Sequence, residues 1–598
     1  MRFLKKYSYL ISVIFILLIL ALTMFYSSIN DSITSDEVPH IAAGYSYVKT
    51  GDYRLNPEHP PLVKDLSGLA LLPLKLAYPF DVWQSNNPVV NNQAKIGEKF
   101  IYKTANNNPD TILLLARLPI MLLSLVFAVL VFWWAKKLFG PKAGIFALIL
   151  YAFDANIIAH SRFVTTDLGI SMTLFLNLFV LYYFLKKPSW KMLLATAVTF
   201  FIALVTKFSV AILVPTYIII IAMLVLRKGK EDKTTLLGGI FNKSWKKRFY
   251  SAFSAFAIFC IAGAVMMWGF YFFHTMNMPA QVQKDLIDQS LPRGGIIPDI
   301  LKTMSDNPIT KPLAQYGLGF SIVSGHVTGE HPAFAFGQIS SEGWWWYYPA
   351  TLAIKVAIPI YVFILLMLIY WRKLRHLDWF TEIYLWIIPA VLMVMGMIGH
   401  IDIGIRYMLP IFPFIFISSS RLAVLIDFRD IFRKKIDCGT SLVTLFISVL
   451  LLWYIISSIT TFPHYLSYFN ETIGSYQNGY KYLTDSNVDW GQDAKRLAEW
   501  VKNSELSKEH RCNYQIYADL FSNNIPATYY IGKDNLINWR VQNGKPRGCF
   551  AISATSRFLQ SSKLKDLKDR TFDYSWLDDE QPIANIGGSI FIYDLNTQ

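Results

Sequence analysis

The chain has 598 residues, of which 54% are hydrophobic and only 16% are charged, and its formal net charge is +15. A soluble protein of this length would carry more charge, and runs of about 20 apolar residues, each able to cross a bilayer, recur along the sequence. The composition therefore excludes an ordinary soluble protein and predicts an α-helical polytopic membrane protein.

Eleven apolar segments are predicted to span the membrane. The third to sixth are short or closely spaced, so their boundaries are less sharply defined than the others. In chain order they cover residues 8–29, 111–134, 142–158, 168–185, 191–206, 208–226, 250–273, 349–371, 380–400, 407–424 and 440–461.

Lys and Arg are concentrated in the connections that fall on one side of the membrane in this eleven-span arrangement. Because Lys/Arg-rich connections stay in the cytoplasm, we expect a multi-pass protein of the plasma (inner) membrane with a cytoplasmic amino terminus. Loops at about 30–110 and 274–348, together with the tail at 462–598, are then extracytoplasmic. The positive net charge reflects this topology and attraction to anionic lipid headgroups, and it does not indicate a nucleic-acid partner.

The tail differs in composition from the membrane-spanning part, so we predict two domains, residues 1–461 and 462–598. Residues 491–504 have a helical pattern, and three runs at 513–520, 548–554 and 589–595 resemble strands. The tail is therefore predicted to be a small α/β domain, with parallel and mixed strand pairing both open. Cys512 and Cys549 lie in this domain and form either a disulfide or two buried thiols.

The sequence SDEVPH, directly after the first apolar segment, places Asp36 and Glu37 at the mouth of a membrane span. One interpretation is a solvated loop in which an Asp caps a helix. A second acidic motif favours a functional interpretation. Asp154 and Asp167 flank the outer turn between the third and fourth spans, at a depth where ionisable groups are costly and usually paired or functional.

The same outer turn contains His160 and Arg162, in the sequence DANIIAHSRFVTTD. A local ion pair between Asp154 and Arg162 would be the structural alternative for this motif. Cations mark the outer ends of further spans, at Lys207, Lys355 and Arg406. Each alone is typical of a side chain that extends its charged group to the membrane surface.

As a set, these cations at one depth could bind a lipid-linked phosphate, and a nearby carboxylate could deprotonate an acceptor. No Walker loop, dinucleotide fingerprint or Cys/His metal spacing occurs in the sequence. A divalent metal held by carboxylates near a phosphate stays open, because it needs no sequence motif.

Six motifs in order resemble the GT-C superfamily of membrane glycosyltransferases, in particular the protein O-mannosyltransferases and the bacterial lipid A aminoarabinose transferases. They extend over about residues 1–500, and they are SDEVPH, HPPL at 59–62, DANIIAHSRFVTTD, GWWWYYPATLAIKVAIP, DIGIRYMLPIFPF, and YFNETIG followed by YLTDSNVDWGQD. The outer tail differs from the β-trefoil-type insert of the eukaryotic mannosyltransferases, which puts protein mannosylation in doubt.

The resemblance implies a GT-C fold and a role for each matching residue. Asp36 is similar to the catalytic carboxylate that acts as general base, and Glu37 is its companion. The remaining candidates are implied at the donor and acceptor site (His59, Asp154, His160 and Asp167) and at the donor phosphate (Lys207, Lys355 and Arg406).

The implied reaction is transfer of a sugar from a polyprenyl-phosphate donor to a hydroxyl or amine of a protein, lipid or glycan acceptor, by an inverting displacement. The sugar is not fixed by the sequence. Transfer of a lipid-linked oligosaccharide is the alternative within enzymes, and a lipid or sugar transporter is the alternative from another class. A transporter would place more charged residues in the middle of its spans than this sequence does.

Overall fold

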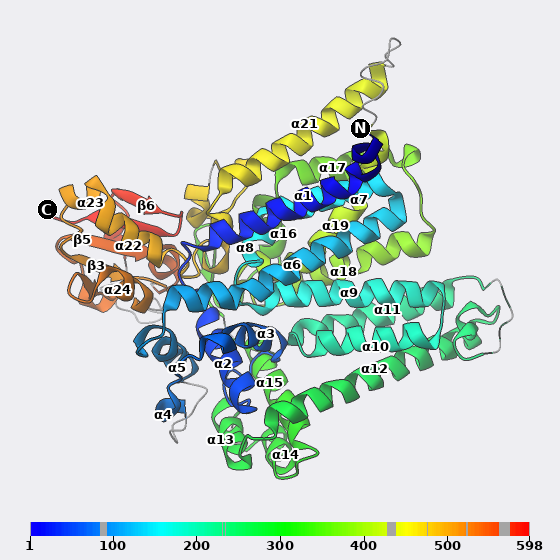
Figure 1. Ribbon diagram of the computed structural model, residues 1–598, viewed down its shortest axis with the longest axis horizontal. Coiled ribbons are helices and arrows are strands. Elements are labelled where there is room, and N and C mark those ends of the chain that lie inside the picture. The colour runs from blue at the N-terminus through cyan, green and yellow to red at the C-terminus, as the bar shows by residue number, and fades with distance from the viewer. Residues whose placement is uncertain are drawn as a thin grey trace.

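The computed structural model describes residues 2–596, except for residues 84–91, 230, 232, 234, 293, 330, 427–437, 475, 522–523 and 561–573. Most of the chain forms a bundle of helices, and the C-terminal sheet lies at one end of it, away from the amino terminus (Figure 1). The helix α1 (Arg2–Ser28) runs from the far end of the bundle towards the tail. This arrangement agrees with a topology that places the amino terminus and the tail on opposite sides of a membrane.

Within the described residues, eight helical stretches are long and apolar enough to cross a membrane. They are Tyr9–Ser28 in α1, α6 (Pro109–Phe139), α9 (Thr166–Lys186), η4 with α11 (Phe208–Ile212 and Leu213–Leu226), α12 (Trp245–Thr275), α18 (Trp379–Ile398), η7 with α19 and η8 (Ile405–Ile411, Phe412–Ser420 and Arg421–Leu425), and Leu442–Thr461 in α21 (Cys438–Thr461). A polytopic helical protein is thereby confirmed.

The count of eleven spans is not reached. Helices α16 (Tyr347–Lys355) and α17 (Ile358–Ile369) pass the test only as a pair, and they are bent by 101° relative to each other. Helices α7 (Pro141–Ala152) and α10 (Trp190–Leu204) are apolar but short. At about 1.5 Å per residue they cannot by themselves cross a hydrocarbon core about 30 Å thick. The residues that the structure describes thus contain eight candidate spans, or nine with the bent pair.

The first outer loop is largely helical. It contains α2 (Glu37–Thr50), α3 (Leu62–Leu71), η1 (Leu72–Leu74), α4 (Phe80–Trp83), α5 (Gln93–Glu98) and η3 (Lys99–Lys103). Helices α2 and α3 cross closely through two glycines. A Cβ at Gly44 would lie 2.0 Å from the Lys64 carbonyl oxygen, and one at Gly68 would lie 2.2 Å from that of Gly44. The crossing therefore requires residues without side chains at both positions.

The second outer loop contains α13 (Ala280–Ser290), α14 (Ile296–Ser305), α15 (Lys311–Thr328) and an antiparallel pair, β1 (Ala333–Ala335) and β2 (Gln338–Ser340). The short helix α8 (Ala155–His160) forms the predicted turn between the third and fourth apolar segments. Single helical turns connect the other elements: η5 (Gly238–Phe241), η6 (Trp371–Lys373), η9 (Tyr465–Ser467), η10 (Glu471–Ile473), η11 (Tyr476–Lys481), η12 (Asp485–Asn487), η13 (Val541–Asn543), η14 (Ser556–Gln560) and η16 (Ser575–Leu577).

The tail carries a five-stranded sheet in the order β4-β3-β5-β7-β6. Its strands are β3 (Ile516–Asp519), β4 (Leu536–Asn538), β5 (Cys549–Ser553), β6 (Ala584–Ile586) and β7 (Ile590–Asp594), and its helices are α22 (Ala494–Asn503), α23 (Glu505–Glu509) and α24 (Ile525–Ile531). Strand β3 is parallel to β4 and β5, whereas β7 is antiparallel to β5 and β6. The predicted α/β tail is confirmed, and the pairing is mixed.

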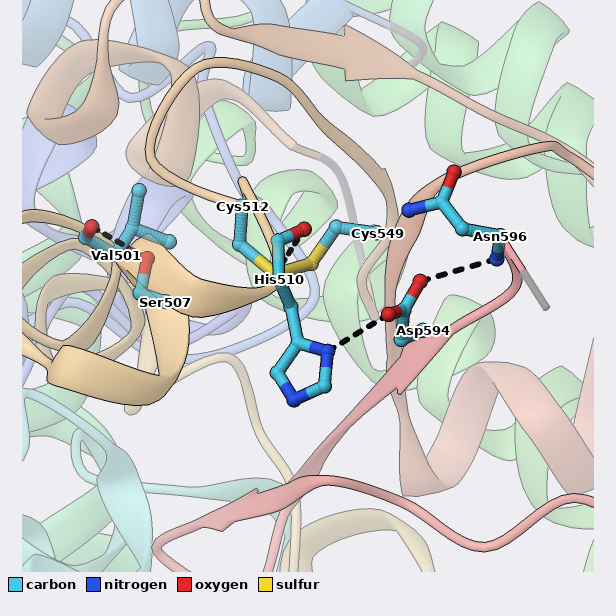
Figure 2. The surroundings of a disulfide bond; sticks show 7 residues. All are labelled: Val501, Ser507, His510, Cys512, Cys549, Asp594 and Asn596. Atoms are coloured by element: carbon cyan, nitrogen blue, oxygen red, sulfur yellow. Dashed lines mark hydrogen bonds and ion pairs between the residues drawn. A yellow bond between two sulfur atoms is a disulfide. The ribbon is translucent and has the colours of Figure 1, made fainter.

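Cys512 and Cys549 form a disulfide in the tail, with their Cα atoms 5.2 Å apart (Figure 2). Beside it, His510 Nδ1 lies 2.7 Å from a carboxylate oxygen of Asp594. The bond joins the segment before β3 to the first residue of β5. Of the two sequence alternatives for these cysteines, the disulfide is therefore the one observed.

Candidate functional site

Two carboxylates and two cationic side chains from four separate segments meet near the end of the bundle that carries the tail. The Arg406 guanidinium, at the start of η7, lies 2.7 Å from the Asp36 carboxylate and 3.7 Å from that of Asp167. Lys207 Nζ lies 2.6 Å from the other oxygen of Asp167. The sequence predicted all four as site residues, and the fold brings them together. We refer to these four residues as the charge cluster.

Asp36 is the accessible acid of the charge cluster. Its side chain is 32% exposed, whereas those of Arg406, Lys207 and Asp167 are 9%, 8% and 3% exposed. It stands at the position before α2 but makes no capping hydrogen bond with its side chain. The alternative of a helix cap is therefore not observed, and the carboxylate is directed to Arg406.

Glu37, the companion of Asp36 in the sequence, is completely buried and fully engaged. Its two oxygens accept from Arg117 Nε and Nη2 at 2.8 and 2.7 Å, and one also accepts from the Val164 backbone N–H at 2.9 Å. Arg117, in α6, is equally buried. This ion pair fixes the start of α2 against α6, and with it the position of Asp36.

Three histidines surround the charge cluster. His40 Nδ1 contacts the Val164 carbonyl oxygen at 2.8 Å, and its ring lies 5.7 Å from that of His59. Burial lowers the pKa of His40 to about 4 and that of His160 to about 3. Both are therefore neutral at physiological pH and add no positive charge beside the charge cluster. The buried Nδ1 atoms of His59 and His160 have no hydrogen-bond partner among the described residues.

Aromatic rings cover the cations of the charge cluster. Lys207 Nζ lies 4.9 Å from the ring centre of Tyr407, and the Arg406 guanidinium lies 4.4 Å from that of Trp490. Trp490 belongs to the tail, in the sequence DSNVDWGQD. This segment is part of one of the six sequence motifs, but no role was predicted for its tryptophan. A lone tryptophan so far from the other motifs carries no signal in sequence alone.

Two predicted site residues have structural partners of their own. Lys355 is buried, and its Nζ donates to the carbonyl oxygens of Leu466 at 2.9 Å and Asn487 at 2.7 Å. Asp154 caps α8 by accepting from the Ile157 N–H at 2.9 Å, and it accepts from the Tyr454 hydroxyl at 3.1 Å. We therefore leave Lys355 and Asp154 out of the charge cluster.

The alternative pair of Asp154 with Arg162 is wrong. Arg162 instead makes a buried ion pair with Asp31, which also pairs with Arg496 of the tail at 2.7 Å. Arg496 in turn lies 2.5 Å from Asp493. Asp31 attracts both guanidiniums because it is buried where the end of α1 meets the tail. This network connects the membrane-spanning part to the tail.

The three acids at 485, 489 and 493 do not act as a set. Asp493 occupies the N-cap position of α22, yet its carboxylate accepts from the side chains of Ser589, Gln492 and Arg496 and not from a backbone N–H of the helix. Asp489 accepts from the backbone N–H groups of Thr555 and Gly491. The side chains of Asp489 and Asp493 therefore bind other parts of the tail.

A metal does not fit the acids of the charge cluster. Asp36 and Asp167 both face guanidinium or ammonium groups, which would repel a divalent cation. Among the residues that the structure describes, no group of three or more His, Cys, Asp or Glu side chains could hold a metal ion.

Residues 103–241 match the family model described as dolichyl-phosphate-mannose-protein mannosyltransferase. The matched stretch contains His160, Asp167 and Lys207, whereas Asp36 and Arg406 lie outside it. The match confirms, for this segment, the glycosyltransferase family that the sequence motifs indicated. No curated protein matches the chain significantly.

Several solved structures are similar to the chain. ArnT from Cupriavidus metallidurans bound to undecaprenyl phosphate matches with 11% identity and a TM-score of 0.40, over 97% of both chains. The Archaeoglobus fulgidus oligosaccharyltransferase matches with 11% identity and a TM-score of 0.45, over 90% of this chain and 64% of that one.

The Saccharomyces cerevisiae protein O-mannosyltransferase Pmt1–Pmt2 complex bound to its sugar donor matches with 17% identity and a TM-score of 0.34. That match covers 45% of this chain and 34% of the other. Likenesses this distant do not bear on the chemistry of the present chain, which has to be argued from its own residues.

Proposed function

We propose that the chain transfers a sugar from a polyprenyl-phosphate donor to an acceptor hydroxyl or amine at the extracytoplasmic face of the membrane. The observation that carries this proposal is the charge cluster itself. It combines an accessible carboxylate with two buried cations at the ends of apolar helices, where the phosphate of a lipid-linked donor would lie. The family match of residues 103–241 supports the same class of reaction.

In the proposed reaction, Arg406 and Lys207 bind the donor phosphate. An acceptor O–H or N–H loses its proton to the Asp36 carboxylate as its oxygen or nitrogen attacks the anomeric carbon. The bond from that carbon to the phosphate oxygen breaks, and the electron pair leaves with the polyprenyl phosphate. The two cations stabilise the charge of the leaving group, and a single displacement inverts the anomeric configuration.

The buried histidines suit a role in holding the donor or acceptor. The Nδ1 atom of His160 and the Nε–H group of Arg406 are both buried and without a hydrogen-bond partner among the described residues. Buried polar groups are normally satisfied, so unpaired ones beside the charge cluster support binding of a polar ligand there. The sugar hydroxyls and the phosphate of the donor have the matching chemistry.

The disulfide supports the proposed location of the tail. Disulfides form and persist in oxidising compartments and are rare in the cytoplasm. The tail that holds Cys512 and Cys549 also supplies Trp490 to the charge cluster. We therefore place the charge cluster and the tail together on the extracytoplasmic side, with the amino terminus in the cytoplasm.

The test is sugar transfer by the purified chain in liposomes, supplied in turn with a panel of radiolabelled polyprenyl-phosphate sugars and with lipid, peptide and glycan acceptors. Asp36→Asn should lower kcat at least about 100-fold, because general-base assistance typically contributes that much. Asp81→Asn is the matched control, since Asp81 lies in the same loop and makes an exposed ion pair with Lys99.

Full activity of Asp36→Asn would contradict its role as the base. Movement of labelled lipid across the bilayer, without transfer from any donor, would contradict the enzyme and favour a transporter.

A further inference from the structure

The tail is joined by backbone hydrogen bonds to the short segment that carries Asp36. The N–H of Ser35 donates to the Trp490 carbonyl oxygen at 3.0 Å, and that of Ser32 donates to the Gln492 carbonyl oxygen at 2.8 Å. The Ser32 hydroxyl donates to the Gly491 carbonyl oxygen at 2.7 Å. Residues 490–492 are thereby fixed next to Asp36.

This pairing places the Trp490 side chain against the charge cluster. The indole is 1% exposed, and its ring centre lies 4.4 Å from the Arg406 guanidinium carbon. Its edges meet the rings of His160 at 5.9 Å and Phe163 at 6.2 Å. These neighbours confine the indole, so the guanidinium rests on a surface that cannot easily move.

A ring face suits Arg406 better than another carboxylate would. Arg406 is buried and already faces two acids, Asp36 and Asp167. A third carboxylate would engage donors that a phosphate needs, whereas an aromatic face attracts the cation and leaves its N–H groups in the guanidinium plane available. The unpartnered Nε–H of Arg406 agrees with this arrangement.

We propose that Trp490 is a positioning residue, whose indole holds the Arg406 guanidinium in the orientation that binds the donor phosphate. The tail thus completes the phosphate site of the membrane-spanning part. This inference rests on the proposed function for the identity of the ligand, and it adds a residue and a domain that the motifs of the charge cluster do not include.

The test replaces Trp490 in the full chain by tryptophans carrying one to four fluorines, which retain the shape of the indole and progressively weaken its attraction for a cation. The readouts are the equilibrium affinity for undecaprenyl phosphate and the KM and kcat of sugar transfer. We expect affinity to fall stepwise, by about tenfold with four fluorines, which corresponds to roughly 1.4 kcal/mol. KM should rise in parallel while kcat changes little.

The matched control is the same fluorinated series at Trp134. This tryptophan is equally buried, but its ring packs on those of Phe175 and Phe414. A stepwise loss at Trp490 with a flat response at Trp134 supports the proposal. A flat response at Trp490, or an equal loss at both sites, overturns it, because the indole would then act through packing alone.

The experiment distinguishes a failure of the proposed function from a failure of the proposed role of Trp490. If the wild-type chain transfers no sugar but still binds undecaprenyl phosphate with an affinity that falls along the Trp490 series, the proposed function fails and the role of Trp490 stands. If transfer is robust and insensitive to fluorination, the function stands and the role of Trp490 fails.

Discussion

At the scale of single residues, Asp167 and Lys207 form a buried ion pair across two helical segments, with 2.6 Å between nitrogen and oxygen. Burying both charges costs free energy because each loses its hydration. Removing one partner is more destabilising still, because the other charge is then buried without a counter-charge. Lys207 is thus held in place by Asp167, so that a donor phosphate would meet an ammonium group that is already oriented.

We predict that Lys207→Gln lowers the free energy of unfolding by about 3 kcal/mol, since Asp167 would be left buried with a weaker set of partners. Adding Asp167→Asn should recover most of that loss but not sugar transfer. Thermal unfolding in detergent measures the stability, and Lys99→Gln, whose ion pair is exposed, is the control. Additive losses in the double variant would contradict the coupling.

The sequence predicted the residues of the charge cluster, but not which of them contact one another. Asp36, Asp167, Lys207 and Arg406 were predictable because charges at the outer ends of apolar segments are rare and costly. Lys355 satisfied the same criterion, yet its carbonyl partners come from residues 466 and 487. No local sequence pattern predicts such a contact between distant residues. The contact of Trp490 with Arg406 is likewise not predictable from the sequence.

At the scale of elements, Lys64 in α3 holds the loop between α2 and α3. Its buried Nζ donates to the Asn56 carbonyl oxygen at 2.8 Å, to Asn56 Oδ1 at 3.0 Å and to the His59 carbonyl oxygen at 2.6 Å. The rings of Tyr47 and Tyr53 flank the ammonium at 5.2 and 5.1 Å. Residues 56–62 (NPEHPPL), which include the HPPL motif, therefore fold around the ammonium group of Lys64.

Lys64→Met should loosen this loop without unfolding the bundle, because three acceptors lose their donor while the apolar stem is retained. Hydrogen exchange of the amides at residues 53–60 should become at least about tenfold faster, as expected if roughly 1.4 kcal/mol of local stability is lost. Lys49→Met, an exposed change in α2, should leave exchange in this loop unchanged. Unaltered exchange in Lys64→Met would show that the loop is held by other contacts.

Helix boundaries show how far periodicity alone can predict elements. All eleven apolar segments are helical, but hydropathy cannot detect the 101° bend between α16 and α17 or the shortness of α7 and α10. In the tail, three strands were predicted from runs that resemble strands. Strands β4 and β6 have three residues each, which is too short for a pattern to be distinguished.

At the scale of the whole molecule, the disulfide stabilises the tail on which the charge cluster partly depends. It closes a separation of 37 residues, for which chain entropy predicts a stabilisation of about 4 kcal/mol. The variant Cys512→Ser/Cys549→Ser should therefore expose the tail to protease at a lower temperature, and it should weaken donor binding as Trp490 loses its support.

Cys260→Ser is the control for the disulfide variant, because Cys260 lies in α12 and is a free thiol. Limited proteolysis over a temperature series measures the stability of the tail, and donor affinity is measured on the same samples. Identical proteolysis of the two variants would show that the tail is held mainly by its hydrophobic core.

The hydrogen bond between Ser32 and Gly491 joins residues 459 positions apart, and this has a consequence for biosynthesis. Chains are made at about 5 to 20 residues per second, so the Asp36 segment waits roughly 20 to 90 seconds for its partner. For most of that time the nascent chain also lacks Arg406, and throughout it lacks the indole of Trp490 that packs on Arg406. A chain that stops short of residue 490 lacks this contact, and we expect it to bind the proposed donor phosphate more weakly than the full chain does.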